Sequence, residues 1–170
     1  MADQRRALVT IALTHVYRNK KNQEKWHYAE VRPIPYKTPL NFPVTTDCSG
    51  FVSLCFYEAG CFDPNNCNFN GSGYTGTLLD HGTRITRDKV VPGDVIVYGA
   101  YPGQHTALVV NVTNQGDILT ASHGQEGDPS LVWCGAPKGP LSGHPVDDRQ
   151  PTYLRFRTAK KGVLARLRGK

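Results

Sequence analysis

The chain has 170 residues, of which 39% are hydrophobic and 20% charged, with a net charge of +6 at neutral pH and a pI near 9.1. This length suits one domain with a core of its own, and no apolar run approaches the roughly 18 residues of a membrane span. The basic balance predicts an anionic partner, which could be nucleic acid, a membrane surface or an anionic cell-wall polymer.

The first predicted element is an amphipathic helix over about residues 4–17. Its apolar stripe consists of Leu8, Ile11, Ala12 and Val16. No apolar h-region or cleavage site precedes it, so we expect synthesis in the cytoplasm without a signal peptide. Residues 18–43 then contain four prolines and no helical period, which predicts a long loop ordered around function. Tyr28 lies within this loop.

The next predicted element is a helix that begins beside Cys48 and ends near Gly60, which is placed for a left-handed cap. Its core-facing positions are Val52, Cys55, Phe56 and Ala59. At a helix N-terminus the dipole and the unpaired N–H groups favour a thiolate and can hold an oxyanion. Cys48 is therefore a candidate nucleophile, and the alternative is a small buried hydrophobic residue.

The five cysteines are Cys48, Cys55, Cys61, Cys67 and Cys134. Their spacings do not match those of zinc sites, so we predict neither a metal nor a cofactor. Cys61 and Cys67 flank a turn and could pair if oxidised, but reduced thiols are the expectation in a cytoplasmic product.

A short helix is predicted over about residues 74–80, after which the chain becomes rich in β-formers. Short strands bounded by Gly, Pro or Asn are predicted at 94–98, 105–112, 117–122 and 152–157. Helices followed by antiparallel strands indicate an α+β domain, which we expect over residues 1–158. Residues 159–170 form a basic C-terminal tail, for which an ordinary solvated end is the alternative to a binding role.

Residues 113–116 have the composition of a hairpin turn. Pairing Asn111 with Asp117 across this turn puts His105 opposite His123, with Cβ atoms about 5 Å apart. Two imidazoles would then lie side by side, and one could orient the other through a hydrogen bond. A one-residue slip or a bulge would undo this register.

Four sequence motifs together resemble the ordered landmarks of the NlpC/P60 cysteine peptidases. They are Asp47-Cys48-Ser49-Gly50-Phe51, Val91-Pro92-Gly93-Asp94-Val95, His105-Thr106-Ala107-Leu108-Val109-Val110 and Ser122-His123-Gly124. The resemblance spans roughly residues 28–124. It implies a papain-like α+β fold, with N-terminal helices packed on a small antiparallel sheet, and an activity on peptidoglycan.

The resemblance also implies roles for individual residues. Cys48 matches the family nucleophile, His105 its general base and His123 the polar residue that orients the base. The alternatives to His123 are Asp117 and Asp128. The remaining implied residues make substrate or oxyanion contacts: Tyr28, Asp47 and Ser49.

The leading hypothesis is a peptidoglycan hydrolase that cleaves an amide bond of the cell wall, as an endopeptidase or amidase, through a thioester. A compact basic chain of this kind resembles phage endolysins, and we expect a monomer without a transmembrane segment that reaches the wall after release or delivery. The alternatives are an interbacterial amidase toxin of the same fold and a non-catalytic wall-binding module. Specific nucleic-acid binding is disfavoured, since no zinc finger, phosphate loop or RNA-binding motif is present in the sequence.

Overall fold

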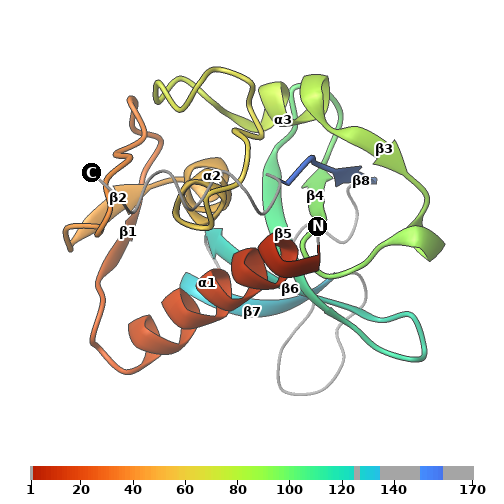
Figure 1. Ribbon diagram of the computed structural model, residues 1–170, viewed down its shortest axis with the longest axis horizontal. Coiled ribbons are helices and arrows are strands. Elements are labelled where there is room, and N and C mark those ends of the chain that lie inside the picture. The colour runs from red at the N-terminus through yellow and green to blue at the C-terminus, as the bar shows by residue number, and fades with distance from the viewer. Residues whose placement is uncertain (1, 125–126, 135–149, 159–170) are drawn as a thin grey trace.

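Three helices pack against a six-stranded sheet in the computed structural model, which describes residues 2–124, 127–134 and 150–158 (Figure 1). The helices are α1 (Ala2–Lys20), α2 (Cys48–Glu58) and α3 (Thr75–His81), and one 3₁₀ turn covers Arg87–Lys89. No helix among these residues is long and apolar enough to cross a membrane.

The main sheet has the strand order β3-β8-β4-β5-β6-β7, and each neighbouring pair is antiparallel. Its strands are β3 (Thr83–Ile85), β4 (Val95–Tyr98), β5 (His105–Val112), β6 (Ile118–Gly124), β7 (Gly127–Cys134) and β8 (Pro151–Arg155). Two short strands, β1 (Trp26–Tyr28) and β2 (Val44–Thr46), form a separate parallel pair. The predicted α+β class is confirmed.

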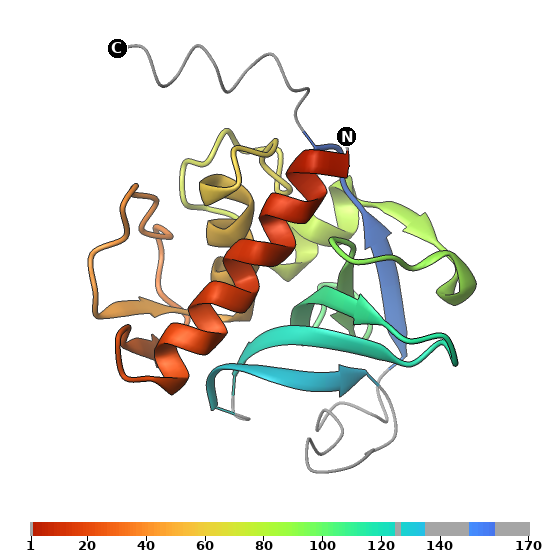
Figure 2. The ribbon, with the colours of Figure 1, turned by 60° about the horizontal axis from the view of Figure 1, so that its bottom comes forward.

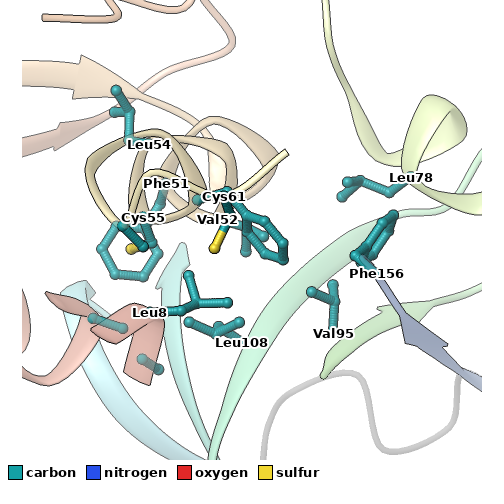
Figure 3. Close-up of a cluster of buried hydrophobic side chains, with 14 of the residues drawn as sticks. Leu8, Phe51, Val52, Leu54, Cys55, Cys61, Leu78, Val95, Leu108 and Phe156 are labelled. Atoms are coloured by element: carbon teal, nitrogen blue, oxygen red, sulfur yellow. The ribbon is translucent and has the colours of Figure 1, made fainter. Parts of the chain in front are cut away.

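Helices α1 and α2 lie side by side against one face of β5, β6 and β7 (Figures 1 and 2). Helix α2 is buried on all sides from Cys48 to Phe56, so it forms the centre of the core. Figure 3 shows its side chains meeting Leu8 of α1 and Leu108 of β5, both fully buried. Close packing of this kind fixes the position of the first turn of α2, where Cys48 lies.

Most predicted elements are present, and the predicted left-handed conformation occurs at Gly60, where φ is 64°. The pair β1 and β2 lies within or beside the segment predicted as a loop, and β3 and β7 were not predicted. Strand β7 contains a glycine, an aspartate and a proline, which are all depleted in strands, and it forms because it pairs along β6. The predicted tail over residues 159–170 lies outside the described residues.

The predicted register between β5 and β6 is wrong. The turn is longer than predicted because it extends to Asp117, whose carbonyl accepts the Thr113 N–H at 2.8 Å. A bulge near Val110 on β5 compensates for part of this extra length. As a result Ala107 pairs with Ser122, where the prediction would pair it with Ala121. A shift of one residue exchanges the two faces of a strand.

A buried carboxylate ties α1 to the sheet. Asp94 is fully buried and accepts hydrogen bonds from Arg5 of α1 at 2.7 Å and from Arg155 of β8 at 2.7 and 3.0 Å. Burial alone would raise the pKa of Asp94, but the Arg155 bonds, the Val91 N–H and Arg5 together lower it. Asp94 is therefore a charged anchor of the fold.

A second buried charge cluster joins α1 to the end of α2. The His15 ring lies between two carboxylates, with Nδ1 2.8 Å from Glu24 and Nε2 2.6 Å from Glu58. Burial would lower the pKa of His15, but the hydrogen bonds to Glu58 and Glu24 outweigh it, and the pKa is raised. This cluster holds the C-terminal end of the helix that begins with Cys48.

Candidate active site

Cys48 lies in a pocket of about 430 Å³ between two walls. The first wall is defined as the lining residues from the end of β1, the segment after it and the start of α2, and the second as those from residues 72–75 and the loop between β4 and β5. The lining residues are Tyr28, Glu30, Arg32, Asp47, Cys48, Ser49, Ser72, Tyr74, Thr75, Pro102, Gly103 and Gln104. The pocket volume falls within the range of about 300–1,000 Å³ that is usual for small-molecule sites.

The motif around Cys48 builds the start of α2. Asp47 is the N-cap, and its Oδ1 accepts the Gly50 N–H at 2.7 Å and the Ser49 hydroxyl at 2.8 Å. Gly50 is required here because a Cβ at this position would overlap the hydroxyl of Thr46. The motif therefore sets Cys48 in the first turn, next to the unpaired N–H groups of the helix.

The environment of the Cys48 sulfur keeps it protonated. Burial, with the side chain only 4% exposed, and then the charge of Asp47 raise the pKa of Cys48 to about 12. The backbone N–H groups of Thr106 and Ser49 and the Tyr28 hydroxyl face the sulfur and oppose this rise. The expected preference for a thiolate at this helix terminus is therefore corrected, and attack by this sulfur needs a base.

Tyr28 lies at the end of β1, where its hydroxyl is close to the Cys48 sulfur. Its ring is 40% exposed, so the residue contacts both the sulfur and the open pocket. Burial and the nearby Cys48 and Asp47 raise its pKa, so the hydroxyl is a proton donor at neutral pH. The structure thus places Tyr28, one of the implied site residues, beside the Cys48 thiol.

His105 is the first residue of β5 and is directly followed by Thr106, whose N–H faces the Cys48 sulfur. The imidazole is buried, and its Nε2 lies 2.8 Å from the Ser122 hydroxyl. The Tyr98 ring lies 6.2 Å away, so His105 is on the face of β5 that carries Ala107 and the smaller core. Ser122 was not among the predicted site residues, because the expected register placed it on the other face.

His123 lies on the opposite face of the sheet, against the core around α2. Its ring contacts Trp26, Tyr28 and Phe51, with centroids 5.5–6.0 Å apart. Its Nε2 lies 3.1 Å from the Thr46 carbonyl and 3.4 Å from that of His27. The structure therefore does not set the two imidazoles side by side as the predicted register required.

The two other candidates for the third group differ in position. Asp117 lies at the hairpin turn, at the end of β5 that is far from His105. Asp128 belongs to β7, and its side chain lies outside the described residues. Ser122 is a side-chain partner of His105, through its hydroxyl at Nε2.

Arg32 is a pocket residue that the sequence reasoning missed. Its Nη2 donates to Asp47 at 2.8 Å and to the Ser49 hydroxyl at 3.0 Å. Asp47 and Ser49, predicted as substrate contacts, are thus bonded to this guanidinium and to the helix. A single arginine in a proline-rich loop carries no periodic signal, so only the fold reveals this contact.

The structure leaves all five cysteines free, including Cys61 and Cys67. Within the described part of the chain, no group of three or more His, Cys, Asp or Glu side chains could hold a metal ion. The groups that the structure places around the Cys48 thiol are the Tyr28 hydroxyl and the backbone N–H groups of Ser49 and Thr106, and His105 directly precedes Thr106 in the chain.

Comparison with solved structures finds similar folds. The chain matches the Resuscitation Promoting Factor Interacting protein RipA with a TM-score of 0.53 and 15% identity, over 92% of this chain and 63% of that one. It matches the P60 domain of an antigen from M. avium paratuberculosis with a TM-score of 0.51 and 16% identity, over 91% and 97% of the two chains. The chain thus spans less than two thirds of the RipA structure, and these likenesses show the fold.

RipD from Mycobacterium tuberculosis is also similar, with a TM-score of 0.49 and 15% identity over 90% of this chain and 97% of that one. Its structure is described as a non-catalytic NlpC/p60 domain protein with an adaptation to peptidoglycan binding.

The resemblance to NlpC/P60 domains is confirmed by the similar structures at the level of the fold. A search of curated proteins finds no match. The family profile of the CHAP domain matches residues 37–124, a segment that contains Cys48, His105 and Ser122. This match covers more than half of the sequence, and the chain therefore belongs to the CHAP domain family.

Proposed function

We propose that this protein is a peptidoglycan hydrolase that cleaves an amide bond of the cell wall through a thioester on Cys48. The observation that carries the proposal is the setting of the Cys48 sulfur, which lies in a pocket at a helix N-terminus and faces the N–H of Thr106, the residue after His105. The basic composition and the P60 domain fold support a wall polymer as the substrate.

In the proposed reaction, His105 takes the thiol proton and the sulfur attacks the amide carbonyl carbon. The resulting oxyanion is stabilised by N–H groups at the start of α2 and by the Tyr28 hydroxyl. When the C–N bond breaks, His105 returns the proton to the leaving amine, and a thioester remains. Water then attacks the thioester with His105 as the base, which releases the acid and restores the thiol.

The raised pKa of Cys48 explains why the base is needed in this scheme, since the free thiol is protonated at neutral pH. We propose that Ser122 holds the His105 ring through the 2.8 Å contact at Nε2 and that Nδ1 of the same ring takes the thiol proton. This replaces the role that the sequence assigned to His123. The proposed catalytic pair is therefore Cys48 and His105, with Ser122 as a positioning residue.

Within this class we propose the role of a phage endolysin that acts as a monomer and reaches the wall after release from the cytoplasm. The net charge of +6 supports binding to an anionic wall. A holin gene beside the gene for this protein would support this role, whereas an adjacent immunity gene would indicate an injected toxin.

The test compares Cys48→Ala and Cys48→Ser with Cys61→Ala on purified sacculi. Cys61 is a matched control because it is similarly buried, at 6% against 4%, and follows the other end of the same helix. We expect both Cys48 variants to lose activity at least 100-fold in a turbidity assay, and Cys61→Ala to keep it. Mass spectrometry of the released muropeptides identifies the bond. A Cys48→Ala variant with a tenth of wild-type activity would refute the thioester mechanism.

A further inference from the structure

The two walls of the Cys48 pocket differ in charge. The wall that includes the start of α2 carries Glu30, Arg32 and Asp47. The second wall, whose lining residues fall within 72–75 and 101–104, has no charged residue among its described lining groups, which are hydroxyls, an amide, a proline and a tyrosine ring. A substrate with one charged and one uncharged portion would therefore bind in a single orientation.

The uncharged wall ends in two exposed tyrosines. Tyr74 lines the pocket and is 39% exposed, while Tyr101, which directly precedes the lining residue Pro102, is 64% exposed. Exposed rings of this kind are costly to leave in water and are typical of binding surfaces. The mechanism proposed above uses neither ring.

Neighbouring groups hold the Tyr74 ring and link the two segments of the wall. A Cβ at Gly76 would overlap the Tyr74 ring, so the glycine allows the ring to fold against the backbone of α3. The Tyr101 hydroxyl lies close to that of Tyr74 and to the Asp80 carboxylate, which together raise the pKa of Tyr101. The Thr75 hydroxyl also donates to the Gly103 carbonyl at 3.4 Å, which links the two segments of the wall. A surface held in this way loses little entropy when a ligand binds.

We propose that this wall, defined by residues 72–75 and 101–104, binds the glycan of peptidoglycan, with an N-acetylhexosamine ring stacked on Tyr101. The C–H face of a pyranose packs on an aromatic ring, and its hydroxyl and acetamido groups suit the hydroxyl and amide groups of the wall. The charged stem peptide would then lie along the wall of Glu30, Arg32 and Asp47. This inference rests on the proposed function and adds the orientation of the substrate.

The test measures binding of chitotetraose, a peptide-free chain of N-acetylhexosamine rings, by an NMR titration of the full-length protein. We expect Tyr101→Ala to weaken binding at least tenfold and Tyr101→Phe to stay within about threefold of wild type, since the phenylalanine keeps the ring. Tyr17→Ala is the matched control, because Tyr17 is a similarly exposed tyrosine, at 59%, on α1 and outside this pocket. This control should bind as the wild type does.

Two outcomes would overturn the glycan assignment: no binding by the wild type, or equal affinity of wild type and Tyr101→Ala. Digestion of sacculi by the wild type is measured separately. Digestion without chitotetraose binding would refute the glycan wall and leave the proposed hydrolase in place. Tyr101-dependent binding without digestion would refute the hydrolase and support the glycan wall.

Discussion

Replacing Ser122 by alanine tests how the His105 imidazole is held. The serine hydroxyl lies 2.8 Å from His105 Nε2, and both side chains are buried. Ser122→Ala removes this contact and adds no bulk. Because Ser122 is proposed to act through His105 and not on the substrate, we expect kcat to fall while KM changes little.

The size of the effect follows from the burial of the contact. A buried hydrogen bond contributes about 1 kcal/mol, and leaving its partner without that bond costs up to about 3 kcal/mol. If this cost appears in the transition state, kcat should fall by about 5- to 150-fold, since each 1.36 kcal/mol is about tenfold in rate. This loss is smaller than that expected for Cys48→Ala, because the nucleophile and the oxyanion donors remain.

The assay is muropeptide release from sacculi, with Thr120→Val as the matched control. Thr120 is also a buried hydroxyl of β6, and it donates to the Val132 carbonyl at 2.8 Å, away from His105. The control should keep kcat within about twofold of wild type. If Ser122→Ala has wild-type kcat while His123→Asn loses more than tenfold, the role assigned to Ser122 is refuted and His123 is the orienting residue.

Three further predictions concern stability and binding. Asp94→Asn should lower the free energy of unfolding by about 3 kcal/mol in urea, because two arginines lose their carboxylate; a loss below about 1 kcal/mol would contradict this. Because the pKa of His15 is raised in the folded protein, His15 should stabilise the fold fully below pH 6.5, the pKa of the unfolded chain, and this stabilisation should be lost as the pH rises through the folded pKa. The free energies of unfolding of the wild type and His15→Gln are compared from about pH 5 to 9. A constant difference over this range would be evidence against the prediction. Truncation after Thr158 should weaken binding to sacculi most at low ionic strength, where screening is least, and unchanged binding there would show residues 159–170 to be a solvated end.

Local sequence signals were enough to predict the helix that carries Cys48. Its core-facing residues recur at helical spacing, and Gly60 follows it with the positive φ expected there, while the structure adds that Asp47 is the N-cap. Capping and backbone conformation depend on residues a few positions apart, so the sequence alone contains them. The α+β class and strand β5 (105–112) were predicted for the same reason, from alternation and turn residues.

Contacts between distant segments were decided by the tertiary structure. Arg32 reaches Asp47 from a proline-rich loop, and burial by the surrounding core, more than the helix terminus, determines the pKa of Cys48. Neither effect has a local pattern, because each depends on which segments pack together.

The partner of His105 also depended on the tertiary structure. Turn composition predicted the hairpin, but the length of the turn and the bulge near Val110 set a register one residue away from the expected one. Because strand side chains alternate, this single step put Ser122 on the face of His105 and turned His123 to the core around α2. A β-bulge is set by pairing and packing across the whole sheet, and the residues of one strand do not specify it.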